Sequence, residues 1–168
     1  MIGLLSAVLN SRQLFNARLD TIMERLPDPD IPIPELDDES KAWIDNYNIV
    51  DTLGVDGQSS DESDGDEDGV YSVKLLHWRN KELVKRLNKA DKVRKTTNKY
   101  GNRRPGTRQR IRKRRSVRDS RETTRPPPTG KPINFYSGEW YMSLTTQQKR
   151  DLNAESELEF LTSLDDDI

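Results

Sequence analysis

The feature that most constrains this chain is a basic segment that runs from Lys74 to Lys131. It contains 22 lysines and arginines but only four acidic residues, so it carries a net charge of +18 in a protein whose total charge is −1. The balancing acids lie mainly in residues 27–73, which carry −14, and in residues 132–168, which carry −6. Charge of one sign repels itself and disfavours a compact core. Opposite signs in neighbouring segments are typical of a chain that binds nucleic acid or an anionic surface, or that pairs with itself.

Composition supports the same conclusion about the fold. Of the 168 residues, 32% are hydrophobic and 34% are charged, whereas ordinary globular domains are about 45–50% apolar. Most of the chain therefore cannot bury enough apolar surface to offset the entropy that ordering would cost. The sequence predicts a mostly disordered protein with short α-helices, a small all-α structure at most, without a sizeable single core.

Residues 1–26 predict an amphipathic helix, which Pro27 would end. Its apolar residues form one row with a seven-residue spacing and a second row beside it: Met1, Val8, Phe15 and Ile22, then Leu5, Leu19 and Leu26. Two interpretations stay open, because such a seam either docks on the rest of the chain or pairs as a coiled coil with a second copy or another protein, with Leu19 in the contact. The polar face is not strongly basic, so no membrane partner is expected.

Residues 27–72 predict an acidic linker rich in proline, glycine and serine. Alternate prolines exclude a helix at its start. Farther along, Trp43 and Tyr47 lie four residues apart. We therefore expect a short helix near residues 41–52, with Ser40 as its N-cap.

Residues 73–95 predict a basic amphipathic helix that Ser72 could cap. The helix has a narrow apolar stripe, which consists of Leu76, Leu83, Leu87 and Ala90. Glycines and prolines recur beyond it, in Tyr100-Gly101, in Arg104-Pro-Gly106 and in Pro126-Pro-Pro-Thr-Gly130. These residues break regular structure, so residues 96–131 predict a disordered, arginine-rich arm.

The last part of the chain predicts an aromatic module over residues 132–153, with a short helix that Thr145 or Thr146 could cap, followed by an acidic tail over residues 154–168. The tail alternates acids with apolar residues around Phe160. Three of its leucines would line one side of a helix: Leu158, Leu161 and Leu164. Two interpretations of the tail stay open, because it could fold into a partner's groove or cover the basic helix within the chain.

The arm predicts sequence-independent contacts with the phosphates of DNA or RNA, because phosphate contacts dominate nucleic-acid affinity and arginine adds planar bidentate geometry. Its densest run, residues 108–121, contains no aromatic residue, so stacking on bases is not supported. The expected contacts are Arg103, Arg104, Arg108, Arg110, Arg112, Lys113, Arg114, Arg115, Arg118, Arg121 and Arg125. Residues 112–115 also match a nuclear-import patch, which favours the nucleus over the cytoplasm. A second interpretation is a solvated polycation that the chain's own acids neutralise.

The acidic segment Asp56–Asp68 is low in complexity and predicts a flexible polyanion that competes with phosphate for the arm. Ser59 and Ser63 each have an acid three residues later, a spacing that acid-directed kinases favour. Phosphorylation there would strengthen the competition. The segment also approaches a calcium loop, but Leu75 stands where a bidentate glutamate is needed, so no metal is expected.

Neither catalysis nor a cofactor is expected. The chain has no cysteine, and His77 is its single histidine, so thiolate chemistry and zinc sites lack ligands. Its carboxylates lie mainly in segments too disordered to hold a general acid and base in register. We find no glycine-rich phosphate loop either. We therefore expect no enzyme activity and no small-molecule substrate.

Large apolar side chains in polar surroundings are candidates for contacts with a protein partner. These candidates are Leu19, Trp43, Trp78, Phe135, Trp140 and Phe160. They support an alternative function, in which the chain is a protein-interaction adaptor or regulatory protein that acts through amphipathic and acidic-aromatic helices. In that case the basic run would serve nuclear import alone.

Two blocks of the sequence together resemble a group of uncharacterised proteins of mushroom-forming fungi. The first block is Leu76-His-Trp78-Arg79-Asn80 with Leu83 and Leu87, and the second is Pro132-Ile-Asn134-Phe135-Tyr136 with Trp140, Leu144 and Leu152. In that group a Trp-Arg-Ser helix, a basic spacer and an Asn-Phe-Tyr...Trp...Leu-Thr module occur in the same order. The resemblance implies a eukaryotic setting and no known activity. We expect the spacer to loop out so that Trp78 and Leu83 meet Phe135 and Trp140 in one modest core.

The sequence as a whole predicts a non-enzymatic, nuclear protein that binds nucleic acid through its arginine-rich arm and is restrained by the adjacent acidic segment. The two functions differ in what they require of the arm. Phosphate binding needs its charge to be accessible, whereas an adaptor needs only the amphipathic segments.

Overall fold

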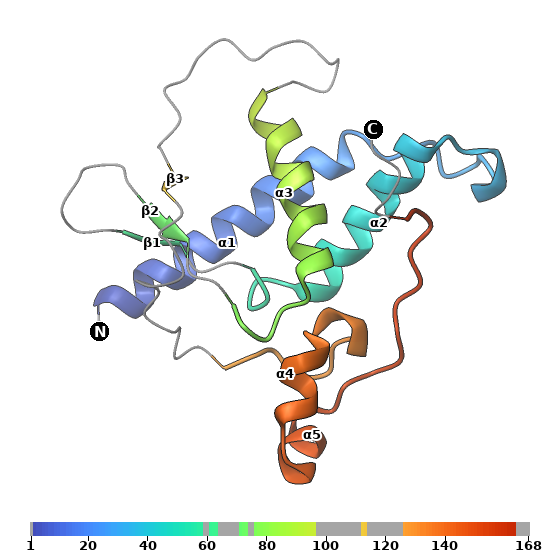
Figure 1. The fold of residues 1–168 in the computed structure, drawn as a ribbon. Helices are drawn as coiled ribbons and strands as arrows, with labels where there is room; N and C mark the ends of the chain where they lie inside the picture. Colours follow the sequence, from blue (N-terminus) through green and yellow to red (C-terminus); the bar gives the residue numbers. More distant parts are fainter. Residues whose placement is uncertain are drawn as a thin grey trace.

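The structure is a computed structural model, and it describes residues 2–58, 61–63, 71–73, 76–96, 112–113 and 126–163. This part of the chain is mainly helical (Figure 1). The α-helices are α1 (Ile2–Met23), α2 (Asp38–Leu53), α3 (Lys81–Thr96), α4 (Gly138–Ser143) and α5 (Thr146–Leu152), and the 3-10 helices are η1 (Ile33–Glu35) and η2 (Ile133–Phe135). The prediction of short helices without a large core is confirmed.

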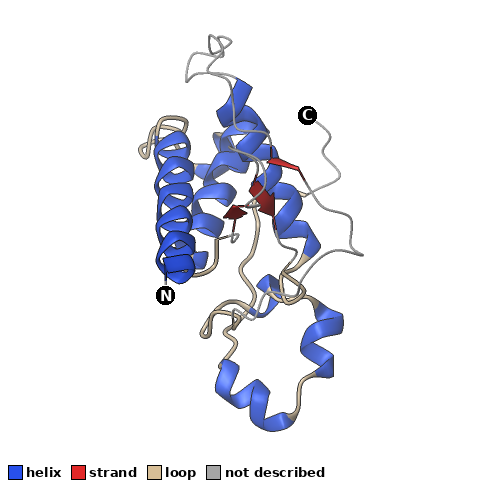
Figure 2. Cartoon of the chain, turned by 90° about the vertical axis from the view of Figure 1, so that its left-hand side faces the viewer, coloured by secondary structure: helices blue, strands red, loops and turns tan. Residues whose placement is uncertain are grey.

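Helices α1, α2 and α3 pack on one another (Figure 2). Helices α4 and α5 lie below them in Figure 1, at one end of this group. Helix α1 therefore docks within the chain, as the first interpretation of its apolar seam expected. Pairing of that seam with a second copy stays a prediction. No helix in the described residues is long and apolar enough to cross a membrane.

The buried face of α1 differs from the row with a seven-residue spacing. Leu14, Arg18 and Ile22 are 5%, 4% and 0% exposed, at successive intervals of four residues, whereas Phe15 and Leu19 are only half-buried. Intervals of four keep residues on one side of a helix. The predicted seam does contact the core, because Ile22 is buried and Phe15 and Leu26 pack against it. The buried face is nevertheless centred on Arg18, which a sequence pattern treats as exposed.

Helix α2 begins three residues before the predicted start, and its N-cap is Asp37 rather than Ser40. The Asp37 carboxylate accepts the Ser40 backbone N–H at 2.7 Å. A carboxylate satisfies an unpaired N–H of the first turn and also complements the helix dipole, so the aspartate provides the stronger cap. The helix ends at Gly54, whose φ of 61° is a conformation that glycine adopts without strain.

Helix α3 begins at Lys81, eight residues after the predicted start, and Ser72 does not cap it. The Asn80 side chain accepts the Glu82 backbone N–H at 3.0 Å and so provides the cap. Before it, Trp78 and Arg79 belong to a turn, and Arg79 forms a β-bridge with Tyr136. The apolar spacing extended the prediction too far, because Leu76 is buried from the turn and not from the helix.

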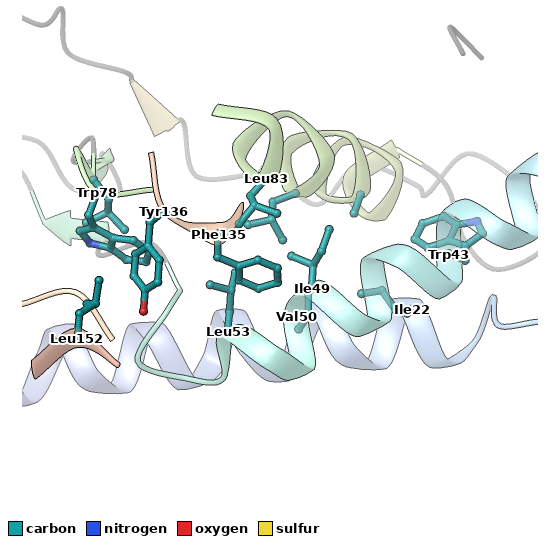
Figure 3. Packing of buried hydrophobic residues seen from close by; sticks show 13 residues of the cluster. Ile22, Trp43, Ile49, Val50, Leu53, Trp78, Leu83, Phe135, Tyr136 and Leu152 are labelled. Carbon is teal, nitrogen blue, oxygen red and sulfur yellow. The ribbon is translucent and has the colours of Figure 1, made fainter. Parts of the chain in front are cut away.

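The two blocks of the resemblance meet, as expected. The Asn80 backbone N–H donates to the Phe135 carbonyl at 3.0 Å, and the Ser137 N–H donates to the Trp78 carbonyl at 2.6 Å. Trp78 and Tyr136 pack with ring centroids 6.1 Å apart, and Trp140 stacks on Tyr136 at 5.8 Å. Figure 3 shows Trp78, Tyr136 and Phe135 beside aliphatic side chains of α2 and α3, among them Leu53 and Leu83. The core consists of Ile22, Trp43, Ile49, Val50, Leu53, Leu76, Trp78, Leu83, Leu87, Ala90, Phe135, Tyr136 and Leu152.

The aromatic module contains two short helices, α4 and α5, where one was predicted. The predicted cap at Thr145 is confirmed, because its hydroxyl accepts the Gln148 N–H at 3.2 Å while the Gln148 side chain accepts the Thr145 N–H at 2.8 Å. Asn153, with φ of 49°, ends α5. The backbone of Glu155 then exchanges hydrogen bonds with Lys131 and Ile133, which closes the module on itself.

The described part of the tail is not helical, although its leucine spacing predicted a helix; Leu164 lies outside the described residues. Leu158 pairs with Asn134, whose side-chain amide donates to the Leu158 carbonyl at 2.9 Å and accepts its N–H at 3.1 Å. The following residues contact α2 and α3, so the tail covers the basic helix within the chain. The three-residue spacing of the leucines had suited a helix, but hydrogen bonds to neighbouring elements take the place of those within a helix.

Three strands of two or three residues form a small sheet: β1 (Asp61–Ser63), β2 (Tyr71–Val73) and β3 (Arg112–Lys113). Strand β1 is antiparallel to β2, and β2 is parallel to β3. The sequence did not predict this sheet. It joins a piece of the acidic segment to a piece of the arm.

Candidate nucleic-acid interface

Four lysines form a ridge on the solvent face of α3: Lys81, Lys85, Lys89 and Lys92. All four are exposed. Their intervals of four, four and three residues place them on one side of the helix, over a length of about 16 Å. None of them forms an ion pair with another side chain in the part of the chain that the structure describes. The lysine ridge is therefore an uncompensated row of positive charge.

The opposite face of α3 explains why the ridge faces water. Leu83, Leu87 and Ala90 are 0%, 2% and 5% exposed and belong to the core. Residues three and four apart share a face, so burial of this apolar stripe turns the lysines outward. The orientation of the ridge thus follows from the packing of α3 on α1 and α2.

Two other charged residues of α3, Arg86 and Asp91, are buried, and each pairs with a residue of another helix. Arg18 of α1 forms a fork with Asp91, with Nε to Oδ1 at 3.0 Å and Nη2 to Oδ2 at 2.6 Å, and its Nη1 donates to Gln58 at 2.5 Å. Arg86 pairs with Asp45 of α2 at 3.3 Å. The bidentate pair of Arg18 with Asp91 and the single contact of Arg86 with Asp45 fix the relative positions of the helices that carry them. Arg18 and Arg86 therefore stabilise the fold and are not accessible to phosphate.

Arg79 is a third buried guanidinium. It is 5% exposed, its Nη2 donates to the Gly57 carbonyl, and its guanidinium lies 5.2 Å from the Trp78 ring. Burial disfavours its charged form and the charge of Arg18 adds repulsion, so the pKa of Arg79 falls to about 9. The turn at residues 54–58 therefore carries backbone and side-chain acceptors for two arginines.

Sequence reasoning missed Arg18, Asp45, Arg86 and Asp91 as structural residues. The signal was present for Arg18, which stands between Leu14 and Ile22 at intervals of four. A charged residue in such a position is buried only with a partner. The partner Asp91 is 73 residues away, and no local pattern could identify it.

The expected phosphate contacts fall mostly outside the described residues. This holds for Arg103, Arg104, Arg108, Arg110, Arg114, Arg115, Arg118, Arg121 and Arg125, and for the phosphorylation candidate Ser59. Arg112 and Lys113 form β3, and Ser63 ends β1. In the sheet register Ser63 pairs with Tyr71, and Tyr71 pairs with Arg112. Neighbouring strands lie about 4.8 Å apart, so the backbones of β1 and β3 are about 10 Å apart.

The candidates for partner contacts occupy different surroundings. Trp43, Trp78 and Phe135 are buried, at 7%, 6% and 0% exposure, and pack within the chain. Packing within the chain is thus sufficient to explain why these three aromatic residues are buried, and contact with a partner through them stays a prediction. The other three, Leu19, Trp140 and Phe160, are half-buried.

A hollow of about 540 Å³ lies beside the C-terminal end of α2. It is lined by Leu53, Gly54, Val55, Asp56, Pro126, Pro127, Pro128, Thr129 and Lys131. The Lys131 ammonium already donates to the Thr52 carbonyl at 2.6 Å. No set of three or more metal-ligating side chains gathers anywhere in the described residues.

Comparison with known proteins identifies a family. No curated protein and no solved structure matches the chain. A family model described as a domain of unknown function matches residues 46–158, which begin within α2 and include α3, the arm, and helices α4 and α5. The matched range contains both blocks that meet in the core, and it covers more than half of the chain. The chain therefore belongs to the family of the domain of unknown function DUF8263.

Proposed function

We propose that the protein is a non-enzymatic, nuclear protein that binds nucleic acid through the lysine ridge and through the arginine-rich arm of residues 103–125. The observation that carries the proposal is the ridge itself, four exposed and uncompensated lysines on one face of a folded helix. The same helix leads along the chain into the arm. A rigid row of charge followed by a polycationic segment suits a phosphate backbone, which carries about one charge per 1.7 Å of duplex.

Binding is expected to be largely independent of sequence. The arm contains no aromatic residue, and the rings of Trp78, Phe135 and Tyr136 are buried in the core. Neither set can stack on bases, which is how sequence-tolerant and sequence-specific single-strand binders gain much of their affinity. Contacts to phosphate fix position but carry no sequence information.

The nuclear location rests on two sequence features. Residues 112–115, Arg-Lys-Arg-Arg, match an import patch. The resemblance of the Trp78 and Phe135 blocks to proteins of mushroom-forming fungi supports a eukaryotic setting, and we propose this origin together with the function.

Restraint by the acidic segment is part of the proposal. Strand β1 contains Asp61 and Glu62, β3 contains Arg112 and Lys113, and β2 lies between them. The sheet thus supports a state in which acidic and basic segments are near each other and phosphate must compete with carboxylates. Phosphorylation of Ser63 or Ser59 would add charge to the acidic side.

The test is a titration of the chain against duplex DNA and single-stranded RNA at two salt concentrations. A variant with Lys85→Gln and Lys89→Gln should bind more weakly and lower the salt dependence by about 0.7 to 0.9 log units per log unit of salt for each lost phosphate contact. The matched control carries Arg12→Gln and Arg150→Gln, which remove the same charge from exposed positions elsewhere. Equal losses in both variants would indicate a general charge effect and contradict a defined ridge.

The restraint needs a separate variant. Gly57 and Gln58 accept hydrogen bonds from Arg79 and Arg18, so a deletion of the whole acidic segment would disturb the fold. Substitution of the acids from Asp61 to Asp68 by their amides removes the charge alone. We expect tighter binding of nucleic acid, and unchanged affinity would contradict restraint. If the chain binds no nucleic acid at all, the adaptor function takes its place.

A further inference from the structure

The tail is held against α2 by one buried carboxylate. Asp45 is 1% exposed. It accepts the Leu161 backbone N–H at 2.8 Å, the Thr162 N–H at 2.9 Å and the Thr162 hydroxyl at 2.7 Å. Three donors from two adjacent tail residues therefore converge on a single side chain, and hydrogen bonds to an ionised group are the stronger ones.

Arg86 of α3 also holds the tail, through Thr162 and Phe160. Its Nη1 donates to the Thr162 hydroxyl at 3.0 Å, and its Nη2 donates to the Thr162 carbonyl at 2.6 Å. The guanidinium also lies 4.4 Å from the centre of the Phe160 ring, an arrangement that attracts a cation to an aromatic face. The tail is thus clamped between α2 and α3 by an acid and a base that also pair with each other.

The Thr162 hydroxyl is the point at which this clamp can be changed by chemistry. It donates to Asp45 and accepts from Arg86, so both of its hydrogen-bonding roles are in use. We propose that Thr162 is a phosphorylation site of an acid-directed serine/threonine kinase, and that its modification releases the tail from α2 and α3. The threonine Oγ would form a bond to the γ-phosphorus of ATP as the bond to the β-phosphate oxygen breaks. ADP would leave, and the hydroxyl proton would pass to the kinase.

The charges around Thr162 determine the direction of the effect. Asp45 and Glu82 both contact Arg86, so the site already holds two carboxylates and one guanidinium. A phosphoryl group adds about −1.5 to −2. It would remove the hydrogen that Thr162 donates to Asp45 and set an anion beside a carboxylate that water cannot reach. The Arg86 guanidinium, already shared by acceptors of three residues, cannot compensate both the phosphoryl group and Asp45, so the undocked tail becomes favoured.

The segment has the features of a kinase substrate. Asp165 stands three residues after Thr162, in the sequence Thr-Ser-Leu-Asp-Asp-Asp, which is the acid spacing noted above for Ser59 and Ser63. Leu161 is 39% exposed and Ser163 is exposed. A segment that buries this little apolar surface opens locally at a small cost in free energy, and the open form is what a kinase would bind.

The experiment treats the full chain with a purified acid-directed kinase and ATP and locates the phosphate by mass spectrometry. Hydrogen exchange then reports the tail directly, because the Leu161 and Thr162 amides both donate to Asp45. We expect their exchange to accelerate about ten- to a hundredfold on phosphorylation. Amides of the core helices, at Ile49 and Leu83, should keep their protection, which separates release of the tail from unfolding.

Two variants make the result specific. Ser163→Ala leaves Thr162 as the acceptor within this segment and should show the same acceleration. Thr162→Val removes the hydroxyl without adding charge. It should not be modified here, and its amides should exchange only a few times faster than those of the unmodified chain, because the backbone donors to Asp45 remain.

Each outcome decides the proposal. Phosphate on Thr162 with faster exchange at Leu161 and Thr162 supports it. Phosphate on Thr162 with unchanged exchange would show that the clamp tolerates the modification, which overturns release. Phosphorylation of a synthetic peptide of residues 155–168 but not of the folded chain would show that the clamp protects Thr162. Modification of neither would exclude this class of kinase, and both of these results overturn the proposal.

Discussion

The two faces of α3 both carry cations, yet the cations differ in what surrounds them. Lys85 and Lys89 are exposed, whereas Arg86 is 7% exposed and contacts Asp45, Glu82 and Thr162. The sign of a charge in the sequence therefore does not say what the residue does. Buried cations with partners position the elements of the fold, and exposed cations without partners are available to a polyanion.

Removal of a buried cation should have the largest effect on the free energy of unfolding, and it tests the contrast between buried and exposed cations most directly. Arg18→Met should lower the free energy of unfolding by about 3–5 kcal/mol, because it removes the bidentate guanidinium that faces the buried Asp91 carboxylate. Chemical denaturation at neutral pH measures the loss. The matched control is Arg12→Met, an exposed arginine of the same helix, for which we expect a change within about 0.5 kcal/mol.

A second substitution shows whether the loss comes from the buried Asp91 carboxylate that no longer contacts Arg18. Arg18→Met combined with Asp91→Leu should recover much of the stability, since replacement of a whole buried pair by apolar groups is often nearly neutral. A double variant as unstable as Arg18→Met alone would show that Arg18 acts through packing or through Gln58, and not through Asp91.

A buried polar group without charge should have a smaller effect. The Tyr136 hydroxyl donates to the Pro128 carbonyl at 2.6 Å, and Tyr136→Phe removes this bond while keeping the ring. We expect a loss of about 1 kcal/mol. Burial raises the pKa of Tyr136, so this stabilisation should be present below pH 10 and decline as the pH rises through the folded pKa. A loss that does not change at high pH would contradict this assignment.

Asp37 is an exposed charged residue that nevertheless has a defined hydrogen-bond partner, so it lies between the buried cations and the exposed lysines in its expected effect on stability. The Ser40 backbone N–H lowers the pKa of Asp37 below its usual 3.8. The cap therefore stabilises the fold above that value, and the stabilisation is lost as the pH falls through the folded pKa. Asp37→Ala should be less stable than the original chain at neutral pH, and the difference should disappear in acid. Thermal unfolding at several pH values measures this, and a constant difference would contradict the role of the carboxylate.

The smallest effect on stability should come from the lysine ridge. Lys85→Gln with Lys89→Gln should change the free energy of unfolding by less than about 0.5 kcal/mol, since exposed, unpaired lysines contribute little to the fold. The same variant should lose affinity for nucleic acid. A large loss of stability would place these lysines with Arg86 and remove the contrast between the two faces.

Local pattern was enough for the helices and for part of the core. Apolar spacing predicted the boundaries of α1, α2 and α3 to within a few residues, except for the start of α3. The cap at Thr145 was also predicted correctly. The start of α3 was wrong, because Trp78 and Arg79 pair with a segment more than 50 residues later and Asn80 ends that pairing. A periodic pattern cannot show where a tertiary contact replaces a helix.

For most of the candidate site, the sequence predicts the charge but not which side chains are exposed. The sequence shows that residues 81–92 are rich in lysine, but the ridge becomes a surface because Leu83 and Leu87 face the core. The clamp on the tail was beyond prediction for the same reason as the Arg18 pair: Asp45 and Thr162 are 117 residues apart. Both depend on a fold that brings distant parts of the chain together.

The junction of the two blocks has a consequence for evolution of the chain. Thr96 ends α3 and Pro126 begins the return to the core, so the described structure holds the chain on both sides of the 29 residues between them, of which Arg112 and Lys113 pair with β2. The entropic cost of closing a loop grows only with the logarithm of its length, about 0.6 kcal/mol for each doubling. Insertions and deletions here should therefore cost little stability. The arm can change in length while its charges remain at a high effective concentration beside the helix that precedes it.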